Sequence, residues 1–153
     1  MENLIYILPV FGLIGLAYMG YLYGWVKKQD AGNDRMKKLA GYISDGALAF
    51  LKAEYRMLMI FVVIAGAALA FVSTLVESTH WFIVIAFVIG AVFSAVAGNV
   101  GMRVATAANV RTTQAARTSL SKALQVAFKG GTVMGLGVAG LAVLGLTVFF
   151  IAF

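Results

Sequence analysis

The sequence has no cysteine, a single proline and only six acidic residues among its 153. Without cysteine the chain has no disulfide framework, no thiolate metal site and no cysteine nucleophile. It also lacks a phosphate-binding glycine loop, a nucleophile elbow and a zinc motif. With 62% hydrophobic and 12% charged residues, the composition lies far from that of a soluble domain.

Four long apolar runs make up most of the chain. They cover residues 4–26, 57–76, 81–102 and 131–153, and none contains a charged residue. Each run is close to the ~20 residues that a helix needs to cross the hydrocarbon core of a bilayer. The sequence therefore predicts an all-α integral membrane protein, with one membrane domain over residues 1–153 and four transmembrane helices.

All twelve Lys and Arg residues lie in two segments, residues 27–56 and 103–130. Because short basic loops stay in the cytoplasm, we expect both segments there, and both ends of the chain and the connection 77–80 on the outer face. The net charge of +6 is then explained by the orientation of the helices in the membrane. The expected partner of the chain is the lipid bilayer. The second basic segment has few aromatics for a nucleic-acid surface, so we expect no nucleic-acid binding.

Both basic segments carry helical patterns that extend the spans into the cytoplasm. Asn33 is placed to cap an amphipathic helix that runs unbroken into the second span. The third span is expected to continue for several turns past Arg103, because residues 103–117 are rich in Ala and free of Gly and Pro. A short apolar stripe then precedes Gly130 and Gly131, which are predicted to break the helix and open the fourth span.

Small residues spaced four apart mark faces on which helix backbones approach closely. The sequence has three such sets: Gly20 and Gly24; Gly90, Ser94 and Gly98; and Gly131, Gly135 and Ala139. We expect these faces to pack helices within one bundle, with dimerisation through one of them as the alternative.

A search for chemistry finds few polar side chains, and no catalytic, cofactor-binding or metal-binding residue is assigned. Asp30 and Asp34 resemble half of a metal-binding carboxylate pair but fit a solvated turn better. His80 has no carboxylate or second histidine near it in sequence. Asn99, in the third span, is expected to form a helix–helix hydrogen bond rather than an ion site.

Four strings in the sequence are more specific than its periodicity. They are GALAFLKAEYR (46–56), GAVFSAVAGNVGM (90–102), ANVRT (108–112) and AFKGGTVMGL (127–136). In this order they resemble the N-terminal quarter of the membrane-bound, ion-pumping pyrophosphatases, over roughly Asp34 to Leu146. The form of Gly98 to Met102 looks closer to bacterial members, which implies the inner membrane of a bacterium.

The resemblance implies a homodimeric enzyme with an inner and an outer ring of helices, in which these four helices belong to the outer ring. Such an enzyme hydrolyses pyrophosphate at a cytoplasmic site and moves Na⁺ or H⁺ outward. Its Mg²⁺ ions are held by aspartates on later helices, and many members need K⁺. None of those acidic motifs has a counterpart here, so no catalytic residue is carried over. The segment is expected to be a scaffold packed against the remaining helices of the same pump.

Arg103, Arg111 and Lys129 are expected at the cytoplasmic rim. They are interpreted as topology determinants, with a long-range attraction for an anionic substrate as the alternative.

Two other classes of function stay open on the sequence alone. One is a free-standing four-helix structural or assembly protein. The other is a small multidrug-type exporter, a chemistry that depends on a membrane-buried carboxylate, and the four runs contain none.

Overall fold

The computed structural model describes residues 6–76 and 81–152. Its elements are α1 (Leu8–Lys28), α2 (Asp34–Leu75), α3 (Phe82–Ala116) and α4 (Leu120–Ala152). All four helices are long and apolar enough to cross a membrane. The predicted all-α membrane fold with four transmembrane helices is confirmed.

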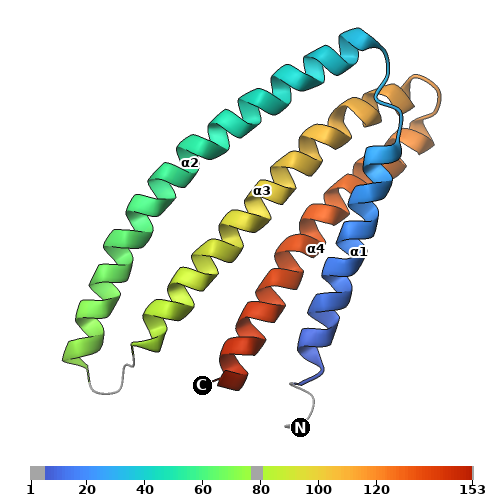
Figure 1. The fold of residues 1–153 in the computed structure, drawn as a ribbon. Helices are drawn as coiled ribbons and strands as arrows, with labels where there is room; N and C mark the ends of the chain where they lie inside the picture. The colour runs from blue at the N-terminus through green and yellow to red at the C-terminus, as the bar shows by residue number, and fades with distance from the viewer. Residues whose placement is uncertain (1–5, 77–80, 153) are drawn as a thin grey trace.

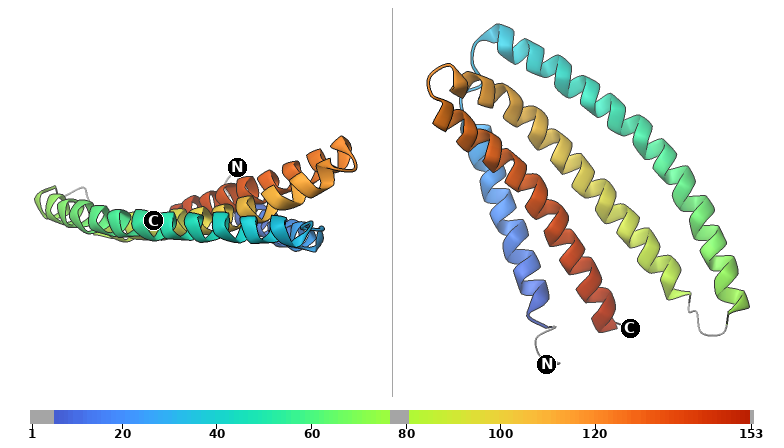
Figure 2. Two further views of the ribbon diagram at one scale, coloured as in Figure 1. Left: turned by 90° about the horizontal axis from the view of Figure 1, so that it is seen from above. Right: turned by 180° about the vertical axis from the view of Figure 1, so that it is seen from behind.

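The helices lie side by side in one curved layer, in the spatial order α2, α3, α4, α1 (Figure 1). Seen from above, the layer is about one helix thick over most of its width (Figure 2). The end of α1, the start of α2, the end of α3 and the start of α4 meet at one end of the layer. This is the cation-bearing end, because every Lys and Arg follows or precedes an apolar run on that side.

The helix ends follow local sequence signals. Pro9 lies in the first turn of α1, where its missing N–H has no intrahelical partner to lose. The side chain of Asn33 accepts a hydrogen bond from the backbone N–H of Met36 at 2.9 Å, which confirms the predicted cap. From that cap α2 runs for 42 residues without a break, about 63 Å at 1.5 Å per residue. The predicted continuation of the third span is also confirmed, because α3 ends at Ala116.

The predicted helix break at Gly130 and Gly131 is wrong. Helix α4 runs continuously from Leu120 through both glycines to Ala152. The reason lies in the packing of Gly130: a Cβ at that position would come within 2.8 Å of the Cβ of Ala108 on α3. The glycine therefore lets two helices approach closely, and this contact outweighs its weak helix propensity of about 1 kcal/mol.

The core is a seam along α4 in which buried positions alternate by three and four residues as far as Gly140, with one more buried position seven residues later. The buried residues of this seam are Ala123, Val126, Gly130, Val133, Gly137, Gly140 and Thr147. Such a spacing keeps one stripe of a helix against its neighbours, as in left-handed coiled coils and most membrane bundles. Where α1, α3 and α4 meet, the seam forms a cluster of Leu22, Val104 and Val133, of which the two valines are fully buried.

Glycines form the tightest contacts between α1 and α4. A Cβ on Gly12 would lie 2.9 Å from Cγ of Leu144 and 3.2 Å from the backbone oxygen of Gly140. A Cβ on Gly140 would lie 2.8 Å from Cδ2 of Leu16. These two backbones therefore touch where no side chain fits between them.

The glycines that the sequence predicted to pack helices are not the ones that make these α1–α4 contacts. At Gly20, Gly24, Gly90, Gly98, Gly131 and Gly135, a Cβ would have no heavy atom of the described residues within 4 Å apart from its chain neighbours and the backbone of its own helix turn. On α4, Gly131 and Gly135 are exposed beside the buried seam. Ser94 is exposed on α3, as Gly90 is. That these faces pack helices within one bundle stays a prediction.

We expect Gly12→Ala to lower the free energy of unfolding by about 1–3 kcal/mol, the usual range for overpacking. The added methyl group would press on Leu144 and on the backbone of Gly140. Gly20→Ala is the matched control on the same helix, because nothing lies within 4 Å of its Cβ position. The measurement is the melting temperature of the purified protein in detergent. Equal melting temperatures for the two variants would contradict the α1–α4 packing described above.

Candidate functional site at the cation-bearing end

Arg111 of α3 joins the end of α1 to the layer. Its Nε donates a hydrogen bond to the backbone oxygen of Gln29 at 3.1 Å, and its Nη2 donates to that of Lys27 at 3.1 Å. Its Nη1 donates to the backbone oxygen of Ala107 on its own helix at 2.8 Å. The last carbonyls of a helix have no intrahelical partner and carry a partial negative charge. Arg111 therefore caps α1 from a neighbouring helix.

Asp30 fixes the connection that follows. Its Oδ1 accepts a hydrogen bond from the backbone N–H of Gly32 at 2.9 Å, and its Oδ2 accepts one from Nε2 of Gln114 at 2.9 Å. The bond from Gly32, and then that from Gln114, lower the pKa of the Asp30 carboxyl below its usual value. Gly32 itself has φ of +79°, a conformation that suits glycine. The start of α2 is thereby held beside α3.

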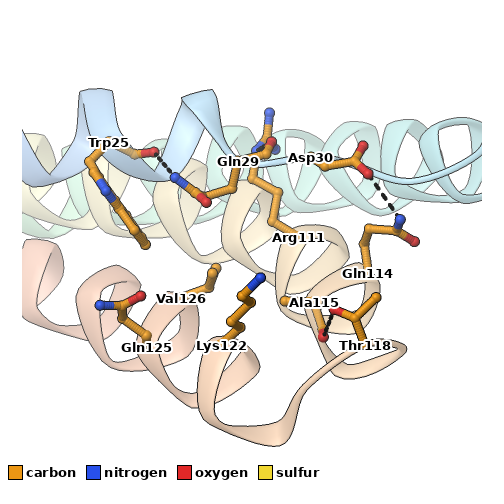
Figure 3. A pocket seen from close by; sticks show the side chains of 10 residues that line it. All are labelled: Trp25, Gln29, Asp30, Arg111, Gln114, Ala115, Thr118, Lys122, Gln125 and Val126. Carbon is orange, nitrogen blue, oxygen red and sulfur yellow. Dashed lines mark hydrogen bonds between the residues drawn. The ribbon is translucent and has the colours of Figure 1, made fainter.

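A hollow of about 320 Å³ lies beside Arg111, between the end of α1, the end of α3 and the start of α4. Figure 3 shows its lining residues, with the amino group of Lys122 pointing toward the space next to Arg111. Most of its polar groups bind one another: Gln29 donates to the backbone oxygen of Trp25 at 3.1 Å, and Gln114 donates to Asp30. This hollow is therefore largely a junction between helices.

A second hollow of about 310 Å³ also borders Arg111, between α1, α2 and α3. Its charged lining residues are Lys27, Arg103 and Arg111, and no carboxylate lines it. Of the predicted rim residues, Arg103 and Arg111 are thus brought together. Lys129 lies elsewhere, with its Nζ 3.6 Å from the centre of the Trp25 ring. Lys27 was missed as a site residue, although it is the first cation after the first apolar run.

The predicted helix–helix hydrogen bond of Asn99 is wrong for the described helices. Its Oδ1 accepts a bond from Nε of Arg103, one turn along the same helix, at 2.7 Å. Tyr55 makes the side-chain bond between α2 and α3 instead, donating to the backbone oxygen of Ala95 at 2.6 Å. Asn99 therefore holds the Arg103 side chain against its own helix.

Asp30 and Asp34 lie at the connection between α1 and α2, whereas Asp45 and Glu54 lie within α2. Asp34 begins α2 and lies 3.7 Å from Nζ of Lys37, an exposed pair one turn away. No group of three or more His, Asp or Glu side chains that could hold a metal ion occurs in residues 6–76 and 81–152. His80 lies outside the described residues.

The fold and this site define a wall of membrane-spanning helices with a basic end. A sequence profile of the family described as inorganic H⁺ pyrophosphatase matches residues 13–153, and the chain belongs to that family.

Curated relatives of the chain are named as pumps. A putative K⁺-stimulated pyrophosphate-energized sodium pump of Clostridium tetani is 46% identical over 136 residues, covering 89% of this chain and 19% of that protein. A K⁺-insensitive pyrophosphate-energized proton pump of Methanosarcina mazei is 41% identical over the whole chain, and 22% of that protein is covered. A K⁺-stimulated sodium pump of Thermotoga maritima is 41% identical, with 97% of this chain and 20% of the relative covered. The chain therefore spans about a fifth of the length of these relatives.

We expect Arg111→Ala to loosen the end of α1, because the backbone oxygens of Lys27 and Gln29 lose a charged donor. The loss of charge-assisted hydrogen bonds predicts a fall in stability of about 1.5–3 kcal/mol. Hydrogen exchange of the backbone at residues 27–32 should accelerate. Arg111→Lys should not restore slow exchange, because an ammonium group cannot reproduce the planar fork of donors.

Arg103→Ala is the control for this experiment, since its described hydrogen bond stays within α3. Exchange at residues 27–32 that is as slow in Arg111→Ala as in Arg103→Ala would show that Arg111 does not cap α1.

Proposed function

We propose that this chain is the N-terminal segment of a pyrophosphate-energised ion pump and serves it as a scaffold. The pump hydrolyses pyrophosphate and couples that reaction to outward transport of Na⁺ or H⁺. The observation that carries the proposal is the match of nearly the whole chain to one family, at about a fifth of its relatives' length.

The shape of the layer supports a scaffolding role. On α2 large apolar side chains are exposed at successive positions around the helix, among them Met59, Ile60 and Phe61. A layer one helix thick has two broad faces, and lipid needs to cover only one of them (Figure 2). The proposal assigns the other face to the remaining helices of the pump.

The catalytic ions of such a pump do not fit the residues described here. Mg²⁺ prefers several oxygen ligands in octahedral geometry, and Asp30 and Asp34 are each engaged in helix connections. We therefore propose that Mg²⁺, the pyrophosphate molecule that is hydrolysed and, where it is required, K⁺ are bound by other parts of the pump. The described residues contribute no step of the hydrolysis.

The uncontacted small-residue faces suit further helices. We propose that Gly90, Ser94 and Gly98 on α3, and Gly131 and Gly135 on α4, pack against the remaining helices of the pump. A second copy of the pump, in a homodimer, is the alternative occupant for the face with Gly20 and Gly24. Small residues let backbones approach closely in lipid, where van der Waals packing drives association.

The denatured mass of the native polypeptide tests this proposal first. In its own membrane, an antibody to residues 27–56 should detect a band several times larger than the 16.2 kDa of this chain. Those membranes should hydrolyse pyrophosphate and move Na⁺ or H⁺ as they do so. Gly12→Ala should reduce the amount of pump while leaving hydrolysis per molecule unchanged, as expected for a scaffold position. A 16.2 kDa band in membranes without pyrophosphate hydrolysis would reject the proposal.

We also propose that the cation-bearing end faces the cytoplasm of a bacterial cell and that the connection 77–80 faces outward, following the charge rule. The chain has no cysteine, so single cysteines can report the topology once any others in the protein have been replaced. On intact cells, a membrane-impermeant maleimide should label Ser78→Cys and leave Ser121→Cys unlabelled. The reverse pattern would invert the orientation.

A further inference from the structure

Three cations from two helices converge on the hollow between α1, α2 and α3. Lys27 comes from the end of α1, and Arg103 and Arg111 lie eight residues apart on α3. Ser44 of α2 and Thr106 of α3 add hydroxyl groups to the lining. The hollow has a volume of about 310 Å³. We call it the basic pocket.

The positive charge of the basic pocket has no carboxylate to balance it. None of its lining residues is acidic. In residues 6–76 and 81–152 the ion pair within 4 Å joins Lys37 to Asp34, and neither residue lines the pocket. Like charges held together raise the local potential and attract anions.

The cations are also oriented by neighbours that leave their charge in place. Asn99 accepts from Nε of Arg103, and no bond within the described part of the chain engages the terminal nitrogens of that guanidinium. The Nζ of Lys27 lies 4.4 Å from the centre of the Tyr23 ring, a cation–π contact that positions the ammonium without neutralising it. The three nitrogens of the Arg111 guanidinium donate hydrogen bonds to backbone oxygens, which carry only partial charges. The terminal nitrogens of Arg103 and the ammonium of Lys27 are thus available to a ligand in the basic pocket. Arg111 lies beside them as a third cation.

This arrangement suits a phosphate group. A guanidinium offers two parallel N–H donors that match the spacing of phosphate oxygens, and an ammonium supplies a compact second charge. The Thr106 hydroxyl already donates to backbone oxygens of α3, whereas Ser44 has no bond within the described residues and can donate to a phosphate oxygen.

The position of the pocket favours the headgroup layer of the membrane. Lys27 is the first cation after the run 4–26, and Arg103 is the first after the run 81–102. Basic pockets between membrane helices at this level bind the phosphates of anionic lipids. We propose that the basic pocket binds a phosphate group, carried either by an anionic phospholipid or by a soluble phosphate or pyrophosphate ion. The proposal rests on residues of this chain alone and does not need the pump activity.

The test measures lipid and phosphate binding to the intact protein. The protein is extracted whole in detergent, and native mass spectrometry follows the binding of added phosphatidylglycerol, with phosphatidylcholine as the zwitterionic comparison. The pocket variant is Lys27→Gln with Arg103→Gln. The control variant is Lys38→Gln with Arg117→Gln, which removes two charges at the same end from residues outside the pocket. Arg111 is left intact because it caps α1.

Wild type and control should bind phosphatidylglycerol more tightly than phosphatidylcholine. In the pocket variant the dissociation constant for phosphatidylglycerol should rise about 30-fold, near fivefold for each cation lost. Each single variant should show about the fivefold effect, and melting temperatures like that of the control should show that the variants are folded.

Competition separates the two sources of phosphate. Displacement of phosphatidylglycerol by inorganic phosphate or pyrophosphate, in wild type and control, would assign the pocket to a soluble ion. Persistent lipid binding would assign it to the phospholipid. Equal binding of phosphatidylglycerol by wild type, pocket variant and control would overturn the proposal. So would the absence of both lipid and phosphate binding in wild type.

Discussion

Close contact between backbones along the α1–α4 seam sets the positions of the other parts. In lipid, apolar side chains gain little by leaving the solvent, so helices associate where their surfaces fit closely. Gly12 and Gly140 provide that fit, because a methyl group at either position would meet atoms of the facing helix at about 3 Å. Further along, Val104 and Val133 are fully buried where the two helices meet α3. The end of α1 is thereby placed beside α3, within reach of Arg111.

At the cation-bearing end, electrostatic interactions matter more than close packing of backbones. The two segments that form this end carry twelve cations and only four acids, and the carbonyls at the end of α1 satisfy one guanidinium without an acidic partner. A carboxylate there would neutralise Arg111 but would also lower the potential of the neighbouring Lys27 and Arg103. Capping by backbone oxygens holds the helix and keeps the positive charge available to an external anion.

Local patterns predicted the spans, the Asn33 cap and the continuation of α3, because each depends on residues within a few turns of one another. The contact of Arg111 with Lys27 and Gln29 crosses more than 80 residues and has no local signature. The predicted helix break at Gly130 is wrong for the same reason, because the close contact at this glycine is with Ala108 on α3. The spacing of four at Gly131 and Gly135 selected the exposed face of α4. The alternation of three and four from Ala123 to Gly140 would have selected the buried one.

The basic pocket exists because two helices extend beyond their apolar runs. Helix α2 begins at Asp34, well before its apolar run opens at Met57, and α3 continues from Met102 to Ala116. These extensions bring Ser44 of α2 and Thr106 and Arg103 of α3 to the same pocket as Lys27, next to the last residue of α1. Without the start of α2, Ala40, Gly41 and Ser44 would not line this side of the hollow. The long α2 therefore supplies the third wall that turns a row of surface cations into a pocket.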